Sequence, residues 1–151
     1  MASTQTTDLV QVADAFIKAF DAADWQRFKA SLSPDVAYEE TGTGRRTQGA
    51  DVYVQLVQGW KQAFPDVAGT IRQAIGSGNT VVQEITWEGT HTGELLGPAG
   101  PMPPSGKRIA VPASVWYTFQ GDQIREIHHH LDMMSMLQQL GAIPAAGAGG
   151  S

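Results

Sequence analysis

The chain has 151 residues, of which 42% are hydrophobic and 17% charged, so it is long enough for one buried core and short for two ordinary domains. Its 10 Lys and Arg against 15 Asp and Glu give a net charge of −5 and no basic run that could neutralise a nucleic-acid backbone. The absence of cysteine excludes disulfides, thiolate nucleophiles and cysteine-bound zinc. No apolar stretch approaches the roughly 20 residues of a membrane span, and the start lacks the regions of a signal peptide, so we expect a soluble, cytoplasmic protein.

The first half of the chain is predicted to be mostly helical, because apolar residues recur there at spacings of three and four. Thr7 is a candidate N-cap of the first helix and Asp24 of a short second helix, which Pro34 follows as a stop signal. The predicted elements are a helix over 8–24, a short helix over 25–32, a strand over 36–41, a turn-rich segment over 41–49 and a helix over 50–64.

The second half changes to the alternating pattern of strands. A GSGN turn joins the first two, which predicts an antiparallel hairpin. The predicted strands cover about 67–75, 80–91, 107–119 and 124–131, with a short helix after Asp132 that Gly141 ends. The Gly/Pro-rich loop over 95–106 is either a lid or rim of a pocket or a plain surface connector.

Helices followed by an antiparallel meander predict an α+β fold. In this fold the N-terminal helices pack on a curved, mainly antiparallel sheet that forms a cone with an internal pocket. We expect a single domain over 1–141 and a flexible Gly/Ala-rich tail over 142–151.

The last predicted strand carries three consecutive histidines and ends at an aspartate, in the segment REIHHHLD. Side chains alternate between the faces of a strand, so Glu126, His128, His130 and Asp132 share one side, and the intervening residues share the other. We expect the first set to face the pocket, where partial desolvation would couple the carboxyl to the imidazoles as an acid/base cluster.

Asp132 has two possible roles. It stands directly before the terminal helix, where a carboxylate is favoured as an N-cap. It could instead act as a general acid or base beside the histidines. The local sequence leaves both roles open.

The segments WEGTHTGELLG and PPSGKRIAVPASVWYTFQGDQIREIHHHLDMMSMLQQLG resemble the SnoaL-like polyketide cyclases, also called ester cyclases, of the cone-shaped superfamily named after nuclear transport factor two. The resemblance covers about 10–141. It implies closure of a polyketide ring by intramolecular aldol condensation without metal or cofactor, with Asp132 as the acid/base residue. It also implies oligomerisation through the outer face of the long strands, and we expect a homodimer.

The chain departs from the family pattern at two places. Its last strand has His128 and His129 where the family usually has Trp and an Asp or Asn, and Glu39 and Glu40 follow Tyr38 where the family often has His-Asp. Ionisable groups thus replace an aromatic wall, and the fold alone does not determine the chemistry.

His91 is the third catalytic candidate, beside Asp132 and His128. It lies on the same predicted strand face as Trp87 and could donate a hydrogen bond to a substrate carbonyl or enolate oxygen. Alternatively, it satisfies backbone groups of the 95–106 loop. Tyr38 and Tyr117 could supply a hydroxyl, and Trp87 and Trp116 are also candidates for the core. The candidate substrate-binding residues are His130, Trp87, Trp116, Tyr38 and Glu40.

The leading functional hypothesis is cofactor-free acid/base chemistry on a small carbonyl or polyketide-like ligand. In it Asp132, shared with His128, removes a proton beside a carbonyl, and His91 or His130 stabilises the enolate. The alternatives are a non-catalytic binding module for a small apolar ligand, a metal site built from His-x-His and the carboxylate, and a hydrolase of the epoxide hydrolase type.

Overall fold

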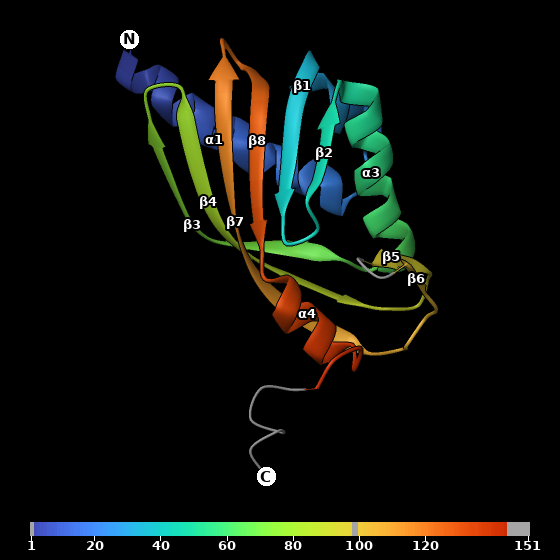
Figure 1. The fold of residues 1–151 in the computed structure, drawn as a ribbon. Coiled ribbons are helices and arrows are strands. Elements are labelled where there is room, and N and C mark those ends of the chain that lie inside the picture. The colour runs from blue at the N-terminus through green and yellow to red at the C-terminus, as the bar shows by residue number, and fades with distance from the viewer. Residues whose placement is uncertain (1, 98–99, 145–151) are drawn as a thin grey trace.

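The computed structural model describes residues 2–97 and 100–144 of the chain. Helices pack against a curved sheet, and the last helix follows the C-terminal end of the last strand (Figure 1). The helices are α1 (Ala2–Asp21), α2 (Trp25–Ala30), α3 (Ala50–Ala63) and α4 (Met133–Gln139). The strands are β1 (Leu32–Thr41), β2 (Arg45–Gln48), β3 (Ala68–Ser77), β4 (Thr80–Thr90), β5 (Leu95–Gly97), β6 (Gly100–Met102), β7 (Arg108–Gln120) and β8 (Gln123–Leu131).

Six strands form the main sheet in the order β2-β1-β8-β7-β4-β3, and β5 and β6 form a separate two-stranded sheet. Only the pairing of β1 with β8 is parallel, and the other described pairs are antiparallel. The predicted α+β class with a mainly antiparallel sheet is therefore confirmed. The parallel pair brings the N-terminal strand beside the last one, which places Tyr38 and Glu40 next to the histidine segment.

The core lies between the inner face of this sheet and helices α1, α2 and α3 (Figure 1). Aromatic rings fill much of this space: Phe16 stacks on Phe28, and Phe28 stacks on Tyr53. Burial of such large apolar surfaces is the main stabilising contribution in a small domain. The half-buried Lys61 on α3 connects that helix to the end of α1 and to the segment before β3, because its Nζ donates to the backbone carbonyls of Asp21 and Val67.

Most predicted elements are present with small shifts at their ends. Asp24 is the N-cap of α2, as predicted, with its Oδ1 accepting a hydrogen bond from the Arg27 backbone N–H at 3.2 Å. Thr7 is not an N-cap, because α1 begins at Ala2 and Thr7 lies within the helix.

Pro34 does not separate a helix from a later strand but lies within β1. The pairing of β1 with β8 is irregular between Leu32 and Ala37, and Pro34 is exposed, so its missing N–H leaves no ladder position unpaired.

The turn-rich segment contains β2, a strand that the pattern did not predict because its sequence RRTQ is polar throughout. It pairs with β1 at the edge of the sheet. The 95–106 loop likewise contains the small hairpin of β5 and β6, whose Leu95 and Met102 pack on the core. Its proposed role as a lid stays a prediction.

Within residues 2–97 and 100–144, no helix combines the length and apolar character that crossing a membrane requires. The predicted tail over 142–151 lies largely outside the described residues, which end at residue 144.

Candidate active site inside the cone

A cavity of about 70 Å³ lies between the sheet and the helices. Its walls are mainly aromatic and aliphatic, and they come from all four helices, β1, β4, β7, β8 and the residues around Phe64 and Val67. The volume suits several water molecules or a small ligand. The lining residues with polar side-chain groups are few, namely Tyr38, Tyr53, Trp60, Trp87, Tyr117 and His129.

The alternation of β8 decides which histidine reaches this cavity. Ile127 and Leu131 are buried and line it, and His129 lies between them on the same face. In the sheet His129 is the neighbour of Glu40 on β1 and of Val115 on β7. His129 is half-buried and borders the cavity.

Both ring nitrogens of His129 are hydrogen-bonded. The Trp87 indole Nε1–H donates to Nε2 at 3.1 Å, so Nε2 carries no hydrogen. In neutral His129 the hydrogen is therefore on Nδ1, 2.9 Å from the Tyr38 hydroxyl oxygen, to which it donates. The Tyr38 hydroxyl in turn donates to Glu40 Oε2 at 2.6 Å. The network thus assigns a continuous chain of donors from Trp87 through His129 and Tyr38 to Glu40.

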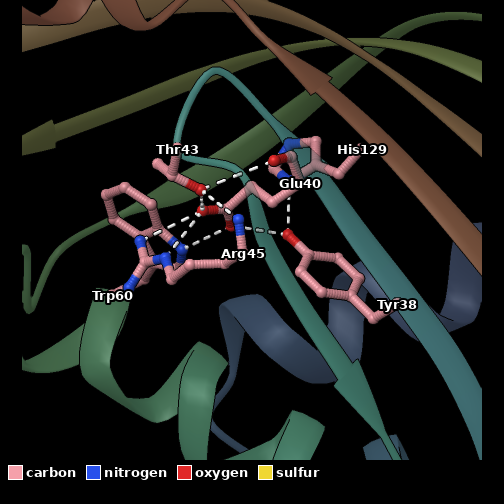
Figure 2. Close-up of polar contacts among 6 residues, drawn as sticks. All are labelled: Tyr38, Glu40, Thr43, Arg45, Trp60 and His129. Atoms are coloured by element: carbon pink, nitrogen blue, oxygen red, sulfur yellow. Dashed lines mark hydrogen bonds and ion pairs between the residues drawn. The ribbon is translucent and has the colours of Figure 1, made fainter. Parts of the chain in front are cut away.

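Glu40 is a fully buried carboxylate at the end of this chain (Figure 2). Its Oε1 accepts hydrogen bonds from Thr43 Oγ1 at 2.7 Å and from Arg45 Nε at 3.1 Å, and Arg45 Nη2 lies 3.0 Å from the same oxygen. The Trp60 indole N–H donates to Oε2 at 3.2 Å. Arg45 also lies over the Trp60 ring, 5.2 Å from its centroid. A buried charge needs this degree of pairing.

The electrostatics of the cluster favour an anionic Glu40 and a neutral His129. Burial by itself raises the pKa of Glu40, but the hydrogen bonds from Tyr38 and Thr43 and the charge of Arg45 outweigh it, and the pKa is lowered. Burial lowers the pKa of His129 to about 4, against the opposing effect of the Glu40 charge. Burial, followed by the Glu40 charge, raises the pKa of Tyr38 well above its ordinary value, so its hydroxyl stays protonated.

Asp132 does not face the cavity, so its expected position there was wrong. It is exposed and caps α4, with Oδ1 accepting a hydrogen bond from the Ser135 backbone N–H at 3.0 Å. Of the two roles that the sequence left open, the structure has the N-cap. The physical reason is that Ile127 and Leu131 take the buried face of β8, which turns the alternate set outward.

His128 and His130 lie on the outer face for the same reason, and their expected position in the pocket was wrong. His128 Nε2 lies 2.6 Å from Glu126 Oε1, and its Nδ1 lies 3.7 Å from Glu39 Oε1. His130 is exposed, with Nδ1 3.0 Å from Thr41 Oγ1. It shares a shallow outer hollow with Asp132.

Among the candidate substrate-binding residues, Tyr38 and Trp87 line the cavity, and Glu40 is bonded to Tyr38 behind its wall. Trp116 is 47% exposed on the outer face of β7, so its expected place in the pocket wall was wrong. Its two neighbours along the strand, Val115 and Tyr117, point inward instead.

His91 is buried and hydrogen-bonds the 95–106 loop. This is the second of the two roles that the sequence left open, not the catalytic one. The His91 Nδ1 accepts from the Ser105 backbone N–H at 3.1 Å and lies 2.9 Å from Ser105 Oγ. The His91 backbone pairs with Lys107 and Gly106. Burial lowers the pKa of His91. It is not among the residues that form the cavity wall.

The structure gives no geometric support for the metal site proposed from His128, His130 and Asp132. Nowhere in the described ranges do three His, Asp or Glu side chains gather so that they could hold a metal ion. His128 and His130 share a face but pair with different partners, Glu126 and Thr41.

The sequence reasoning missed His129, Thr43, Arg45 and Trp60 as site residues. A signal for His129 was present, since Ile127 and Leu131 flank it at two residues on either side, and an apolar alternate set marks the buried face. Thr43 and Arg45 carried no such signal, because they reach Glu40 only through the turn between β1 and β2.

Fold and cavity together define a small α+β cone that encloses an apolar cavity with a hydrogen-bonded cluster of ionisable side chains in its wall. A family model described as SnoaL-like polyketide cyclase matches residues 10–140. The chain therefore belongs to the SnoaL-like polyketide cyclase family. A search of curated proteins finds no significant sequence match.

Solved structures share this fold at low sequence identity. AclR from Streptomyces galilaeus, a proposed hydroxylase, is 23% identical with a TM-score of 0.80 over 93% of this chain and 85% of that chain. A proposed SnoaL-like polyketide cyclase from Jannaschia sp. CCS1 is 18% identical with a TM-score of 0.83 over 93% and 96%. An LEH-like epoxide hydrolase from M. tuberculosis is 19% identical with a TM-score of 0.69 over 91% and 92%.

Proposed function

We propose that this protein is a cofactor-free acid/base enzyme that removes a proton beside the carbonyl group of a small, mainly apolar substrate bound in the cavity. The observation that carries the proposal is His129, a neutral imidazole with an unprotonated Nε2, set in an apolar cavity wall and linked through Tyr38 to the Glu40 carboxylate. Family membership supports cyclase chemistry as the reaction class.

In the proposed reaction, the lone pair of His129 Nε2 takes the α-proton, and the electrons of the C–H bond form an enolate. The Trp87 indole N–H, released from Nε2, donates to the enolate oxygen. The imidazolium keeps its Nδ1 hydrogen bond to Tyr38, and the anionic Glu40 behind Tyr38 stabilises its positive charge. The enolate carbon then attacks a second carbonyl of the same molecule, and His129 returns the proton to the resulting alkoxide.

His129 replaces Asp132 as the proposed base because of geometry. A base must come within hydrogen-bond reach of the proton that it removes, and His129 borders the cavity whereas Asp132 is exposed on the outer side. The dry walls also strengthen every interaction with the enolate charge.

Deuterium exchange at the α-carbon of a panel of small ketones and β-keto esters, followed by NMR, tests this proposal. We expect His129→Gln to lower the enzymatic exchange rate by about 100-fold or more, the usual contribution of a general base. The wild-type rate should fall as the pH drops toward the His129 pKa of about 4, because the protonated imidazole cannot accept a proton.

His128→Gln is the matched control, since it removes the neighbouring histidine from the outer face. It should exchange at the wild-type rate. Circular dichroism and the thermal midpoint establish that both variants are folded. Equal rates for His129→Gln and wild type, or no exchange above buffer with any substrate, would refute the proposal.

A non-catalytic binding module is the second candidate, and one observation favours it. Both nitrogens of His129 and both carboxyl oxygens of Glu40 already have partners within the protein. In this alternative the cluster orients a ligand and removes no proton. Ligand-induced thermal stabilisation without exchange of the same ketone would support this candidate over the enzyme.

We also propose that the protein is a homodimer, formed through the outer face of the long strands. Ile75 on β3 and Trp116 on β7 are exposed there, and both pair across the sheet with Val82 on β4. These three residues form an apolar row, which we call the outer apolar row, and a second copy could cover it.

A further inference from the structure

A second polar pair lies in the core, apart from the cluster around His129. Gln83 on β4 and Tyr117 on β7 are fully buried, and Tyr117 lines the cavity. The Tyr117 hydroxyl donates to Gln83 Oε1 at 2.6 Å. Gln83 faces inward because it alternates with Val81 and Ile85, both fully buried on the same strand.

The pair has more hydrogen-bond donors than acceptors within reach. Gln83 Nε2 is buried and finds no partner among the described residues. Reversing the amide does not remove the surplus: Nε2 would then donate to the Tyr117 oxygen, and the Tyr117 O–H would be the donor without an acceptor. A buried donor without an acceptor is unfavourable and calls for a functional explanation.

The strand register places this pair opposite the first cluster. Gln83, Val115 and His129 form one row across β4, β7 and β8, and Tyr117, Ile127 and Tyr38 belong to the neighbouring row. Each polar pair is thus a tyrosine with a polar residue from an adjacent strand. The two polar pairs are separated by two strand spacings, about 10 Å between backbones, and the cavity wall between them is apolar.

We propose that Gln83 and Tyr117 form a second ligand-binding point of the cavity, which selects carbonyl compounds that carry another oxygen at the end away from His129. The proposal deepens the proposed function, because it assumes that the first carbonyl lies at His129. The selection itself is a binding step and requires no turnover. Tyr117, which lines the cavity, contacts the ligand. With the Gln83 amide reversed, Nε2 donates to the Tyr117 oxygen, and the Tyr117 O–H donates to the ligand oxygen. Gln83 is buried behind Tyr117 and is a positioning residue.

The chemistry of the pair favours a neutral oxygen over a carboxylate. Neither residue is charged, since burial raises the pKa of Tyr117 well above its ordinary value and the hydroxyl stays protonated. An anion buried there would lack a compensating charge. A ketone, ester or ether oxygen accepts a hydrogen bond from the Tyr117 O–H without that penalty.

The test compares 4-methoxycyclohexanone with 4-ethylcyclohexanone, two ketones of nearly equal size in which one ether oxygen replaces a methylene. Dissociation constants are measured for wild type and Tyr117→Phe, which keeps the ring and removes the hydroxyl. The ratio of the two constants within each protein cancels general hydrophobic differences, as in a double-mutant cycle. We expect this ratio to favour the ether by at least about fivefold more in wild type than in the variant, the effect of one hydrogen bond to a buried donor.

A second measurement does not depend on how well the variant folds. In nitrogen–hydrogen NMR spectra of the wild-type protein, the Gln83 side-chain amide signals should shift with 4-methoxycyclohexanone and stay in place with 4-ethylcyclohexanone. A purely structural Gln83 would respond equally to both.

A ratio that changes by less than about twofold overturns the inference, as does an amide signal that responds equally to both ketones. Failure of 4-methoxycyclohexanone to bind at millimolar concentration overturns it too. If His129→Gln exchanges like wild type while the ether preference depends on Tyr117, the proposed catalysis fails and this binding point stands.

Discussion

His129 and its neighbours show how strongly the function of a side chain depends on a single residue step. Three histidines follow one another, yet only the middle one borders the cavity, whereas His128 and His130 pair with outer-face residues. The same chemical group is therefore a neutral, buried imidazole at one position and an exposed one at the next. Alternation along the strand is the cause.

The N-cap role of Asp132 leads to a prediction at the residue scale. Asp132→Ala should lower the free energy of unfolding by about 0.5–2 kcal/mol, because the Ser135 N–H loses its acceptor. Asp132→Asn should change it little, since Asn caps helices as well as Asp. Urea unfolding curves measure both.

Neither Asp132 variant should lower the rate of α-proton exchange. Equal stabilities of the Ala and Asn variants would contradict the capping account. Loss of exchange in a folded Asp132→Asn variant would return Asp132 to the chemistry.

At the scale of elements, the turn between β1 and β2 connects the Glu40 cluster to α4. Thr43 and Arg45 from this turn and β2 bind the Glu40 carboxylate. Gly42 in the same turn has a φ of +101° and lies against Met133, the first residue of α4. The absence of a side chain at Gly42 therefore allows the turn and the helix to approach.

Gly42→Ala and Gly44→Ala form a matched pair that tests this contact. A Cβ built on Gly42 would lie 2.7 Å from Met133 Cγ, whereas no described atom lies within 4 Å of one built on Gly44. Both glycines have positive φ, so each substitution should cost about 1–2 kcal/mol in backbone strain. Gly42→Ala should cost clearly more in thermal or urea unfolding, because Met133 must move. Equal losses would show that the contact is unimportant.

At the scale of the whole molecule, the sheet has one face that forms the cavity and one that is open. The outer apolar row of Ile75, Val82 and Trp116 crosses three adjacent strands of the open face. Exposed apolar rows of this kind are typical of interfaces between subunits. The proposed dimer would bury this row without touching the cavity.

Sedimentation velocity at micromolar concentration tests the dimer. We expect wild type to sediment as a dimer and Trp116→Lys to shift to the monomer, because burying an unpaired charge in the interface is unfavourable. Val52→Lys, at a similarly exposed apolar residue on α3, is the control and should remain a dimer. A monomeric wild type, or a Trp116→Lys variant that stays dimeric, would contradict the proposal.

The sequence by itself determined the fold class, most elements and the N-cap of α2 at Asp24, because these depend on local periodicity and on hydrogen bonds between near neighbours. It also identified Tyr38, Glu40 and Trp87 as candidate site residues, and all three belong to the site. Only the tertiary structure decided that His129, not Asp132, faces inward, and that Thr43, Arg45 and Trp60 surround Glu40. These placements depend on the parallel pairing of β1 with β8 and on the helices that cover one face of the sheet, and both are contacts between segments far apart in the chain.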